Sequence, residues 1–286
     1  MALTLGGNNT SYKSIRYLND AKSKMDKSML RISSGKRILS GADDPGGLSV
    51  SMKLQTQIHS TNAAKDRIEN AKSYVEMQDS ALSTASDILS EMSSLENSYR
   101  NSTSDSLKAS YASQFKELQV QLNSLKSEQL NGVSLFSNSA QDNMTIHTSA
   151  SGSGATVSLG FLDIAGAVSV SSTENLAAAS TVSSAVSISD ISESELVSAV
   201  DGISALRAQA GGKLSVLEFA GEYLGNMSTT LESAHGRIMD VDIAEETANF
   251  AKYSMQYEAA AAAVAQANIA MGAVMDLLLG SINRDR

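Results

Sequence analysis

The sequence predicts a mainly α-helical fold. We expect a long antiparallel coiled-coil helical bundle with a small β-hairpin insertion, in which the N- and C-terminal helices pair as an inner coiled-coil domain. Apolar residues recur at spacings of three and four over long stretches, the period of a packed helix face. Only one Pro occurs in 286 residues, so little interrupts these helices. With 5% aromatics and no Trp, thin helix–helix contacts are favoured over a thick core.

Residues 1–34 are expected to form the N-terminal part of the inner coiled-coil domain. Their apolar residues keep the helical spacing once Lys22 is allowed at one core position. A helix of this length is marginal in water by itself, so it needs a partner. The predicted packing residues are Ile15, Leu18, Met25, Met29 and Ile32.

Residues 35–47 interrupt the helical pattern and are expected to be a linker. They hold the single proline, Pro45, which ends one helix and lets the next begin off-axis, with Ser40 or Asp43 available to cap it. Asp43 and Asp44 are a candidate carboxylate pair for metal or acid–base work, but acidic groups also suit the positive end of a helix, which we favour. The predicted turn residues are Ser34, Gly35, Arg37, Ile38, Asp43, Asp44, Pro45 and Gly47.

Residues 48–143 and 190–236 are expected to supply the two halves of a core helical domain. The first half begins with a helix free of Gly and Pro from Leu48 to Tyr99, roughly 75 Å long. In the second half Gly211, Gly212, Gly221 and Gly225 weaken the helix but let neighbouring helices approach closely. The predicted core residues are Ile68, Val75, Leu82, Leu89, Leu118, Leu122, Leu214, Leu217 and Leu224.

Residues 144–189 differ in character from the helical segments. The sequences MTIH and ATVSLGF alternate on either side of a Gly-rich stretch, which predicts a β-hairpin. Residues 171–189 are rich in Ser and Ala and are expected to form a loosely structured surface connection. Helical spacing returns in residues 237–286, the C-terminal part of the inner coiled-coil domain. The packing residues predicted there are Val264, Ala267, Met271, Val274 and Leu278.

Composition and charge exclude several kinds of function. The net charge of −9 argues against a nucleic-acid-binding surface, and the absence of Cys excludes disulfides and thiolate metal sites. The N-terminal residues lack the basic start and apolar run of a cleaved secretory signal, so none is expected. No window reaches the ~18 consecutive apolar residues of a membrane helix.

No motif proposes a reaction. His59, His147 and His235 are far apart and lack the spacing that places two metal ligands on one helix face. The stretch SASGSGAT has no following GK[ST] and lies in a strand region, so it is not a phosphate-binding loop. We therefore predict no catalytic, cofactor-binding or metal residue, no cofactor and no enzymatic activity.

Several motifs nevertheless resemble one family, the bacterial flagellins. Near the N-terminus the sequence reads LRISSGKRILSGADDPGGLSVS, followed further on by QLNSLKSEQLNGVSLF. Near the C-terminus it reads ESAHGRIMDVDIAEETANFAKYSM and AAAVAQANIAMGAVMDLLL. These stretches occur in the family's order at both ends of the chain. The resemblance implies that residues 35–47 are the spoke between the inner coiled coil and the core domain.

The resemblance also implies a function. A flagellin is a subunit that self-polymerises into the extracellular helical filament of the flagellum and so enables motility. It travels unfolded through the type III export channel and folds at the tip. Implied partners are identical subunits, paralogous flagellins, the flagellar cap, the hook–filament junction proteins and an export chaperone at the C-terminal helix, but no nucleic acid or membrane.

The chain departs from the family pattern in several places, among them Leu130, where the family usually has Phe, and the tail GSINRDR, which extends past the usual ending. The large variable outer domains are missing, which makes this a short form. Many flagellins carry an Arg before Glu-Leu that is central to detection by the animal receptor TLR five, and Ser93 stands at the aligned position. The resemblance therefore does not imply recognition by that innate receptor.

Three other interpretations are open. A hook–filament junction protein shares both terminal motifs, although the GADDPGG and AQAN motifs favour a flagellin. A secreted coiled-coil adhesin or effector would use the Ser/Thr-rich middle as its binding element. A flagellin with a protease insert would be an enzyme, but it would need a metal motif that the sequence lacks.

Ser and Thr in residues 148–189 are also candidate acceptors of O-linked glycans.

Overall fold

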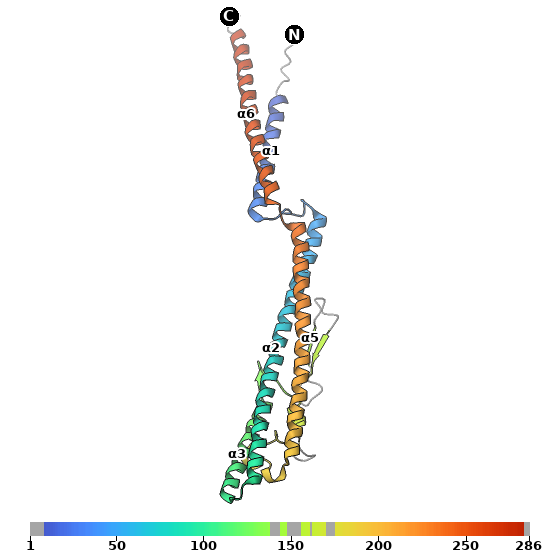
Figure 1. The fold of residues 1–286 in the computed structure, drawn as a ribbon. Coiled ribbons are helices and arrows are strands. Elements are labelled where there is room, and N and C mark those ends of the chain that lie inside the picture. The colour runs from blue at the N-terminus through green and yellow to red at the C-terminus, as the bar shows by residue number, and fades with distance from the viewer. Residues whose placement is uncertain (1–8, 138–143, 148–155, 161, 170–174, 283–286) are drawn as a thin grey trace. The chain divides into compact units, whose positions relative to one another are not determined.

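The computed structural model describes residues 9–137, 144–147, 156–160, 162–169 and 175–282. The long helices are α1 (Asn9–Ser34), α2 (Pro45–Asn101), α3 (Asp105–Lys126), α5 (Glu193–Met239) and α6 (Ile243–Ile282) (Figure 1). Short elements lie between α3 and α5: β1 (Gln129–Leu130), β2 (Val133–Ser134), β3 (Met144–His147), β4 (Thr156–Leu159), α4 (Ile164–Ala167), η2 (Val182–Ser184) and η3 (Ile188–Asp190). This architecture confirms the predicted mainly α fold.

The chain forms two compact units. Unit 1 comprises Met1–Thr56 and Leu231–Arg286, and therefore both ends of the chain. Unit 2 comprises Gln57–Thr230. Each is described by itself below, and the domain limits predicted from the sequence stay predictions.

The core of unit 2 is built on one face of α2. Its buried residues follow alternating steps of three and four, the spacing of a coiled-coil seam. A second buried line, displaced by one residue, widens the face so that α2 packs against more than one partner. The structure places Ile68, Val75, Leu82 and Leu89 at full burial, together with Leu122 of α3 and Leu217 and Leu224 of α5. Leu118 and Leu214 are partly buried against this core.

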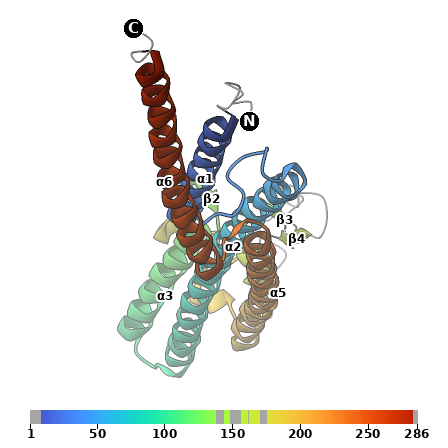
Figure 2. The ribbon, with the colours of Figure 1, turned by 90° about the horizontal axis from the view of Figure 1, so that it is seen from above.

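Helix α5 runs antiparallel to α2 within unit 2. The hydroxyl of Ser228 donates to Asn62 Oδ1 at 2.9 Å, and Arg207 Nε donates to Asp79 Oδ1 at 3.0 Å. Residue numbers that rise along α2 therefore face residue numbers that fall along α5, so the two helices are antiparallel. Figures 1 and 2 show the parts of α2, α3 and α5 in unit 2 lying side by side.

One glycine of α5 permits a close contact that the sequence does not reveal. A Cβ added to Gly202 would lie 2.5 Å from the backbone oxygen of Ala167 in α4. The prediction that Gly211, Gly212 and Gly225 permit close helix approach is wrong for the single chain, because a Cβ there would meet nothing within 4 Å among the described atoms. Gly221 makes only an ordinary contact, with Ile68.

Two antiparallel hairpins follow α3. Strands β3 and β4 form the predicted hairpin, with Met144 opposite Leu159 and His147 opposite Thr156. The smaller β1–β2 hairpin turns at Asn131 and Gly132, both with positive φ. Asn-Gly between two strands is a typical hairpin turn, so this signal was present in the sequence. The hydroxyl of Tyr74 donates to the Ser134 carbonyl at 2.7 Å, which fixes the hairpin to α2.

The expectation of a loosely structured connection is wrong for its described part, residues 175–189. Leu176, Ala177 and Ile188 are buried in the core of unit 2. Gln119 of α3 holds this segment twice, because its amide donates to the Val186 carbonyl and accepts from the Val186 N–H, both at 2.9 Å. A few apolar residues within a Ser-rich stretch suffice to dock it, since the buried backbone has its own hydrogen-bond partners. Residues 171–174 lie outside the described residues.

Candidate functional site: the terminal helix pair and its linker

In unit 1 the two terminal helices pack along their length, and the face that α1 turns to α6 is made largely of small and polar side chains. Ser11, Ala21 and Ser28 are buried, and Leu18 and Met25 between them are partly buried. After a first step of seven, from Ser11 to Leu18, these residues follow steps of three and four, as in a coiled coil. Because three of these five residues are Ser or Ala, the pair buries little apolar area per turn.

The predicted register of this pair needs correction. Ile15 and Met29 are 39% and 62% exposed, off the face that meets α6, whereas Leu18, Met25 and Ile32 lie on it. The seam passes through Ala21 and Ser28 instead of Lys22 and Met29, because small side chains let the helices approach each other.

On α6 the seam passes through Val264 and Ala267, which are partly buried. Met271, by contrast, is 46% exposed. The side chains of Val274 and Leu278 lie outside those that the structure describes.

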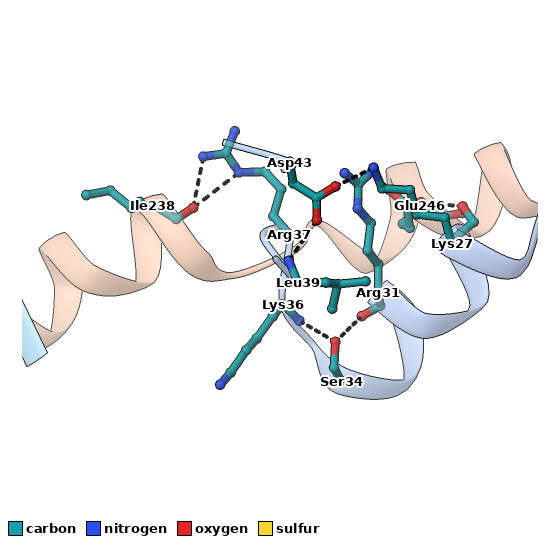
Figure 3. A network of polar contacts seen from close by, with 10 residues as sticks. Lys27, Arg31, Ser34, Lys36, Arg37, Leu39, Asp43, Ile238 and Glu246 are labelled. Atoms are coloured by element: carbon teal, nitrogen blue, oxygen red, sulfur yellow. Dashed lines mark hydrogen bonds and ion pairs between the residues drawn. The ribbon is translucent and has the colours of Figure 1, made fainter. Parts of the chain in front are cut away.

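A buried polar cluster joins α1 to the first turn of α6. The Ser28 hydroxyl donates to the Glu246 carboxylate. Arg31 Nη1 lies 3.7 Å from Glu246 Oε2, and Figure 3 shows Arg31 and Glu246. Ser28 and Glu246 are both buried. A carboxylate near the start of a helix is favoured by the positive helix end. The sequence reasoning missed this cluster, because it placed Met29 instead of Ser28 on the seam.

Helix α1 ends through a left-handed residue. Gly35 has φ +68°, a conformation that costs a residue with a Cβ additional free energy. The Ser34 hydroxyl accepts from the Lys36 N–H at 3.2 Å and lies 3.4 Å from the Arg31 carbonyl, to which it donates (Figure 3). The helix therefore stops cleanly, and the chain leaves it in a defined direction.

The next residues of the linker satisfy the C-terminal end of α5. The Arg37 N–H donates to the Met239 carbonyl at 2.6 Å, and its guanidinium donates to the Ile238 carbonyl at 3.2 Å from Nε and 2.9 Å from Nη2 (Figure 3). The Val241 N–H in turn donates to the Gly35 carbonyl at 3.0 Å. The last carbonyls of a helix have no partner within it, and a cation there also suits the helix dipole. The linker thus supplies donors to the last carbonyls of α5, and the residue after α5 supplies a donor to the linker.

Asp43 organises the second half of the linker. Its Oδ2 accepts from the N–H groups of Leu39 at 3.1 Å and Ser40 at 3.2 Å, and its Oδ1 pairs with the ammonium of Lys27 on α1 (Figure 3). The Lys27 contact, followed by the backbone donors, lowers the pKa of Asp43 to about 2. Asp43 therefore ties the turn to the inner helix instead of capping α2.

Asp44, not Ser40 or Asp43, is the residue that caps α2. Its Oδ1 accepts from the Gly47 N–H at 2.8 Å, with Pro45 at the first helical position, where no N–H is needed. A Cβ on Gly47 would lie 2.4 Å from Asp44 Oδ2 and 2.8 Å from Ile38 Cδ1. The absence of a side chain at Gly47 thus leaves room for the Asp44 carboxylate and for the buried side chain of Ile38. Asp44 thus lies at the positive helix end, the role favoured from the sequence for both carboxylates, whereas Asp43 pairs with Lys27 instead.

One Ser–His contact in unit 1 resembles a nucleophile beside a base. Ser51 Oγ lies 3.1 Å from His235 Nε2, but Ser51 is buried between helices, where no substrate reaches it. Within the described part of the chain, no group of three or more His, Asp or Glu residues is placed to hold a metal ion. No helix among the described residues is long and apolar enough to cross a bilayer.

Fold and site together define a helical structural protein whose first and last long helices, α1 and α6, pair with each other. Residues 7–141 match the family model of the bacterial flagellin N-terminal helical region, and residues 194–278 match that of the C-terminal helical region. The chain belongs to the bacterial flagellin family. Members of this family are structural subunits of the flagellar filament, outside the cell, and are not enzymes.

The chain is similar to named flagellins over most of its length. It is 30% identical to a flagellin of Listeria innocua over 90% of this chain and 93% of that one. It is 25% identical to flagellin FlaB2 of Treponema pallidum, over 96% of this chain and all of that one. Flagellin FlaB1 of the same organism is also 25% identical, over 92% of this chain and 95% of the relative.

Proposed function

We propose that this chain polymerises with copies of itself into the flagellar filament, and that the α1–α6 pair of unit 1 is the part completed by neighbouring copies. In the single chain each helix of the pair is covered only where it packs against the other helix, and its remaining faces are exposed. Tyr12, Tyr17 and Leu30 of α1 and Met255 and Ile269 of α6 are all exposed. A monomer rarely leaves so many large apolar side chains in water along one pair of helices.

The observation that carries the proposal is the composition of α6 from residue 259 to residue 273. This stretch contains no charged residue and is mostly Ala, whereas an amphipathic surface helix carries charge on its outer face. Ser28 lies level with Glu246, so at ~1.5 Å per residue in both helices Asn9 lies level with about residue 265. The rest of α6 therefore extends beyond the first described turn of α1. A mostly apolar helix with no charge on any face is typical of a buried helix, and in a filament other copies would cover it.

The linker has a defined role in this proposal. Its turn residues, from Ser34 to Gly47, set the direction in which the chain leaves α1 and enters α2. Gly35, Arg37, Asp43 and Asp44 each make a contact that fixes one step of that path. A filament requires every subunit to present the same geometry, and such a linker supplies it.

Export and accessory partners complete the proposal. The subunit leaves the cell unfolded through the flagellar type III system, without a cleaved signal, and folds at the tip beneath the cap. It meets the hook–filament junction proteins at the base and an export chaperone at α6. Two related flagellins from one organism, FlaB1 and FlaB2, make a mixed filament with a paralogue a reasonable extension.

The test is polymerisation of the purified chain. Sheared filament seeds or ammonium sulfate are added, and the product is examined by negative stain and by circular dichroism. Long uniform hollow filaments are expected, because sulfate favours burial of the exposed apolar faces and seeds supply ends onto which subunits add. A monomer that adds only as a short cap on hook ends would replace the proposal with the junction protein. Failure to bind at all would favour the adhesin.

A shortened chain sharpens the same test. A variant that ends at Val274 lacks Leu277, Leu278 and Leu279. It is expected to polymerise poorly, because each fully buried Leu contributes ~1.5 to 3 kcal/mol. Normal polymerisation of this variant would show that the end of α6 does not join the subunits.

A further inference from the structure

The turn of the β1–β2 hairpin carries a residue pair whose chemistry the proposed function does not use. Asn131 is the only Asn of the chain that is followed directly by Gly. The strands pair Leu130 with Val133, so Asn131 and Gly132 are the two residues of the turn. Both are exposed, and both have positive φ, 54° for Asn131 and 81° for Gly132. A side-chain amide and the next peptide nitrogen thus lie together at an exposed turn.

These two groups can react with each other. The backbone nitrogen of Gly132, after losing its proton to water or hydroxide, attacks the side-chain carbon Cγ of Asn131. The new C–N bond closes a succinimide ring, and the bond between Cγ and the amide nitrogen breaks with release of ammonia. Water then opens the ring at either carbonyl. One opening leaves an aspartate, and the other leaves an isoaspartate, in which the main chain runs through the side chain.

The fold leaves room for this attack. A side chain on the residue after Asn crowds the attacking nitrogen, and glycine has none. A Cβ added to Gly132 would meet nothing within 4 Å among the described atoms, so no neighbouring group encloses the turn. Asn131 must rotate out of its left-handed conformation to bring Cγ to the nitrogen. Each flanking strand has only two residues, so few hydrogen bonds oppose this local opening.

The base of the hairpin, by contrast, is held on α2. The Tyr74 hydroxyl donates to the Ser134 carbonyl at 2.7 Å. The side-chain amide of Gln78 donates to the carbonyl of buried Leu135 at 2.6 Å. The Leu135 N–H in turn donates to the Glu128 carbonyl at 2.9 Å, across the hairpin. The turn can therefore open while the residues on either side of it stay docked.

We propose that Asn131 is a site of spontaneous deamidation in the folded chain, and that its isoaspartate product loosens the β1–β2 hairpin from α2. The product adds a carbon to the main chain of a turn whose length sets the register of the two strands. It also adds a negative charge to a chain of net charge −9. The reaction needs no second copy of the chain, so the inference does not depend on polymerisation.

The first experiment follows the reaction in the full folded chain. The protein is incubated at neutral and at mildly alkaline pH and digested, and the mass of each Asn-containing peptide is measured. Asn131 is expected to convert first, and faster at the higher pH, because the attacking nitrogen must lose a proton. The internal control is Asn101, which is exposed but precedes Ser and donates its amide to the Asn97 carbonyl at 2.9 Å. Conversion of Asn131 in the urea-unfolded chain, but no faster than Asn101 in the folded one, would overturn the inference.

The second experiment separates the isoaspartate from the added charge. Isoaspartate in the aged chain is labelled by a protein isoaspartate methyltransferase with a radioactive methyl donor. Asn131→Gln is expected to abolish this label, because the longer side chain must close a larger and more slowly formed ring. A label that persists in this variant would place the modification at another residue and overturn the inference.

Asn131→Asp carries the charge without the extra main-chain carbon and is the matched control for stability. The isoaspartate fraction of the aged wild-type chain, separated by ion exchange, is expected to melt at a lower temperature than this variant. Hydrogen exchange of residues 128–135 is expected to be faster in that fraction. Equal melting and equal exchange would show that the product does not loosen the hairpin from α2.

Discussion

The two units of this protein use the same helical spacing to opposite effect. In unit 2 the seam of α2 places Ile68, Leu82 and Leu89 at full burial. In unit 1 the corresponding seam of α1 carries Ser11 and Ser28, and the larger residues between them are only partly covered. Periodicity therefore shows where a helix packs but not how strongly, because buried apolar area supplies most of the stabilisation. The seam of unit 2 therefore buries more apolar area than the seam of unit 1.

The difference between the two units is tested most strongly by truncating one seam residue in each of them. Leu82→Ala is expected to lower the free energy of unfolding of unit 2 by about 3 kcal/mol, since it empties a fully buried site. Leu18→Ala should cost the monomer less than about 1 kcal/mol, because Leu18 is only partly buried. Urea unfolding with hydrogen exchange measured for each unit compares the two. Equal costs would show that unit 1 is as self-sufficient as unit 2.

Two separate glycine substitutions on α5 test how tightly unit 2 is packed. Gly202→Ala is expected to lower its stability by roughly 1 to 3 kcal/mol, because the new methyl group would overlap the Ala167 carbonyl. Its control, Gly211→Ala, lies on the same helix in open space and should stabilise the monomer by roughly 0.5 to 1 kcal/mol. Thermal melts of both variants give the measurement. Two shifts of the same sign would contradict the Gly202 contact.

The cap of α2 tests the linker of unit 1. Asp44→Ala is expected to cost about 1 kcal/mol, the usual effect of losing a side chain that accepts from the first turn. Asp44→Ser keeps an acceptor and should recover most of the loss. Hydrogen exchange of the first turn of α2 reports the effect directly. If Ser and Ala behave alike, the Asp44 side chain does not act as a cap.

The smallest expected effect is the pH response of the linker. The pKa of Asp43 is lowered to about 2 in the folded chain, against ~3.9 in an unfolded one. Its contribution is therefore fully present above pH ~4 and is lost as the pH falls towards 2. Hydrogen exchange of residues 38–43, followed through this range, should show loss of protection.

The matched variant for this measurement is Asp43→Asn. It cannot carry the charge that pairs with Lys27, so its exchange should be weakly protected and nearly independent of pH. Full protection of the Asn variant at neutral pH would exclude Asp43 as the organiser of the turn.

The sequence predicted unit 2 better than unit 1, and the reason is physical. Large aliphatic residues such as Val75 and Leu89 mark a seam because few other positions can hold them. Ser28 is as polar as any surface residue, so the true seam of α1 was passed over in favour of Ile15 and Met29. A seam made of small and polar side chains is therefore hard to recognise from the sequence.

In the linker, too, some features could be predicted from the sequence and others could not. That residues 35–47 interrupt the helices was predictable from Gly and Pro, and so was a structural role for the two carboxylates. Which carboxylate caps α2 was also within reach, because Pro45 at the first helical position makes Asp44 the preceding cap residue. The pairing of Arg37 with Ile238 was not predictable, since nothing local relates two residues 201 positions apart.

That separation has a consequence for the order in which the chain gains structure. Closing a loop becomes entropically more costly as it lengthens, by ~0.6 kcal/mol for each doubling. The Asn62–Ser228 contact lies inside unit 2. Once it forms, the free chain between Arg37 and Ile238 shrinks from 201 positions to roughly 35, which lowers the closure cost by roughly 1.5 kcal/mol. Unit 2 is thus expected to form first and to bring the two ends of the chain within reach of each other.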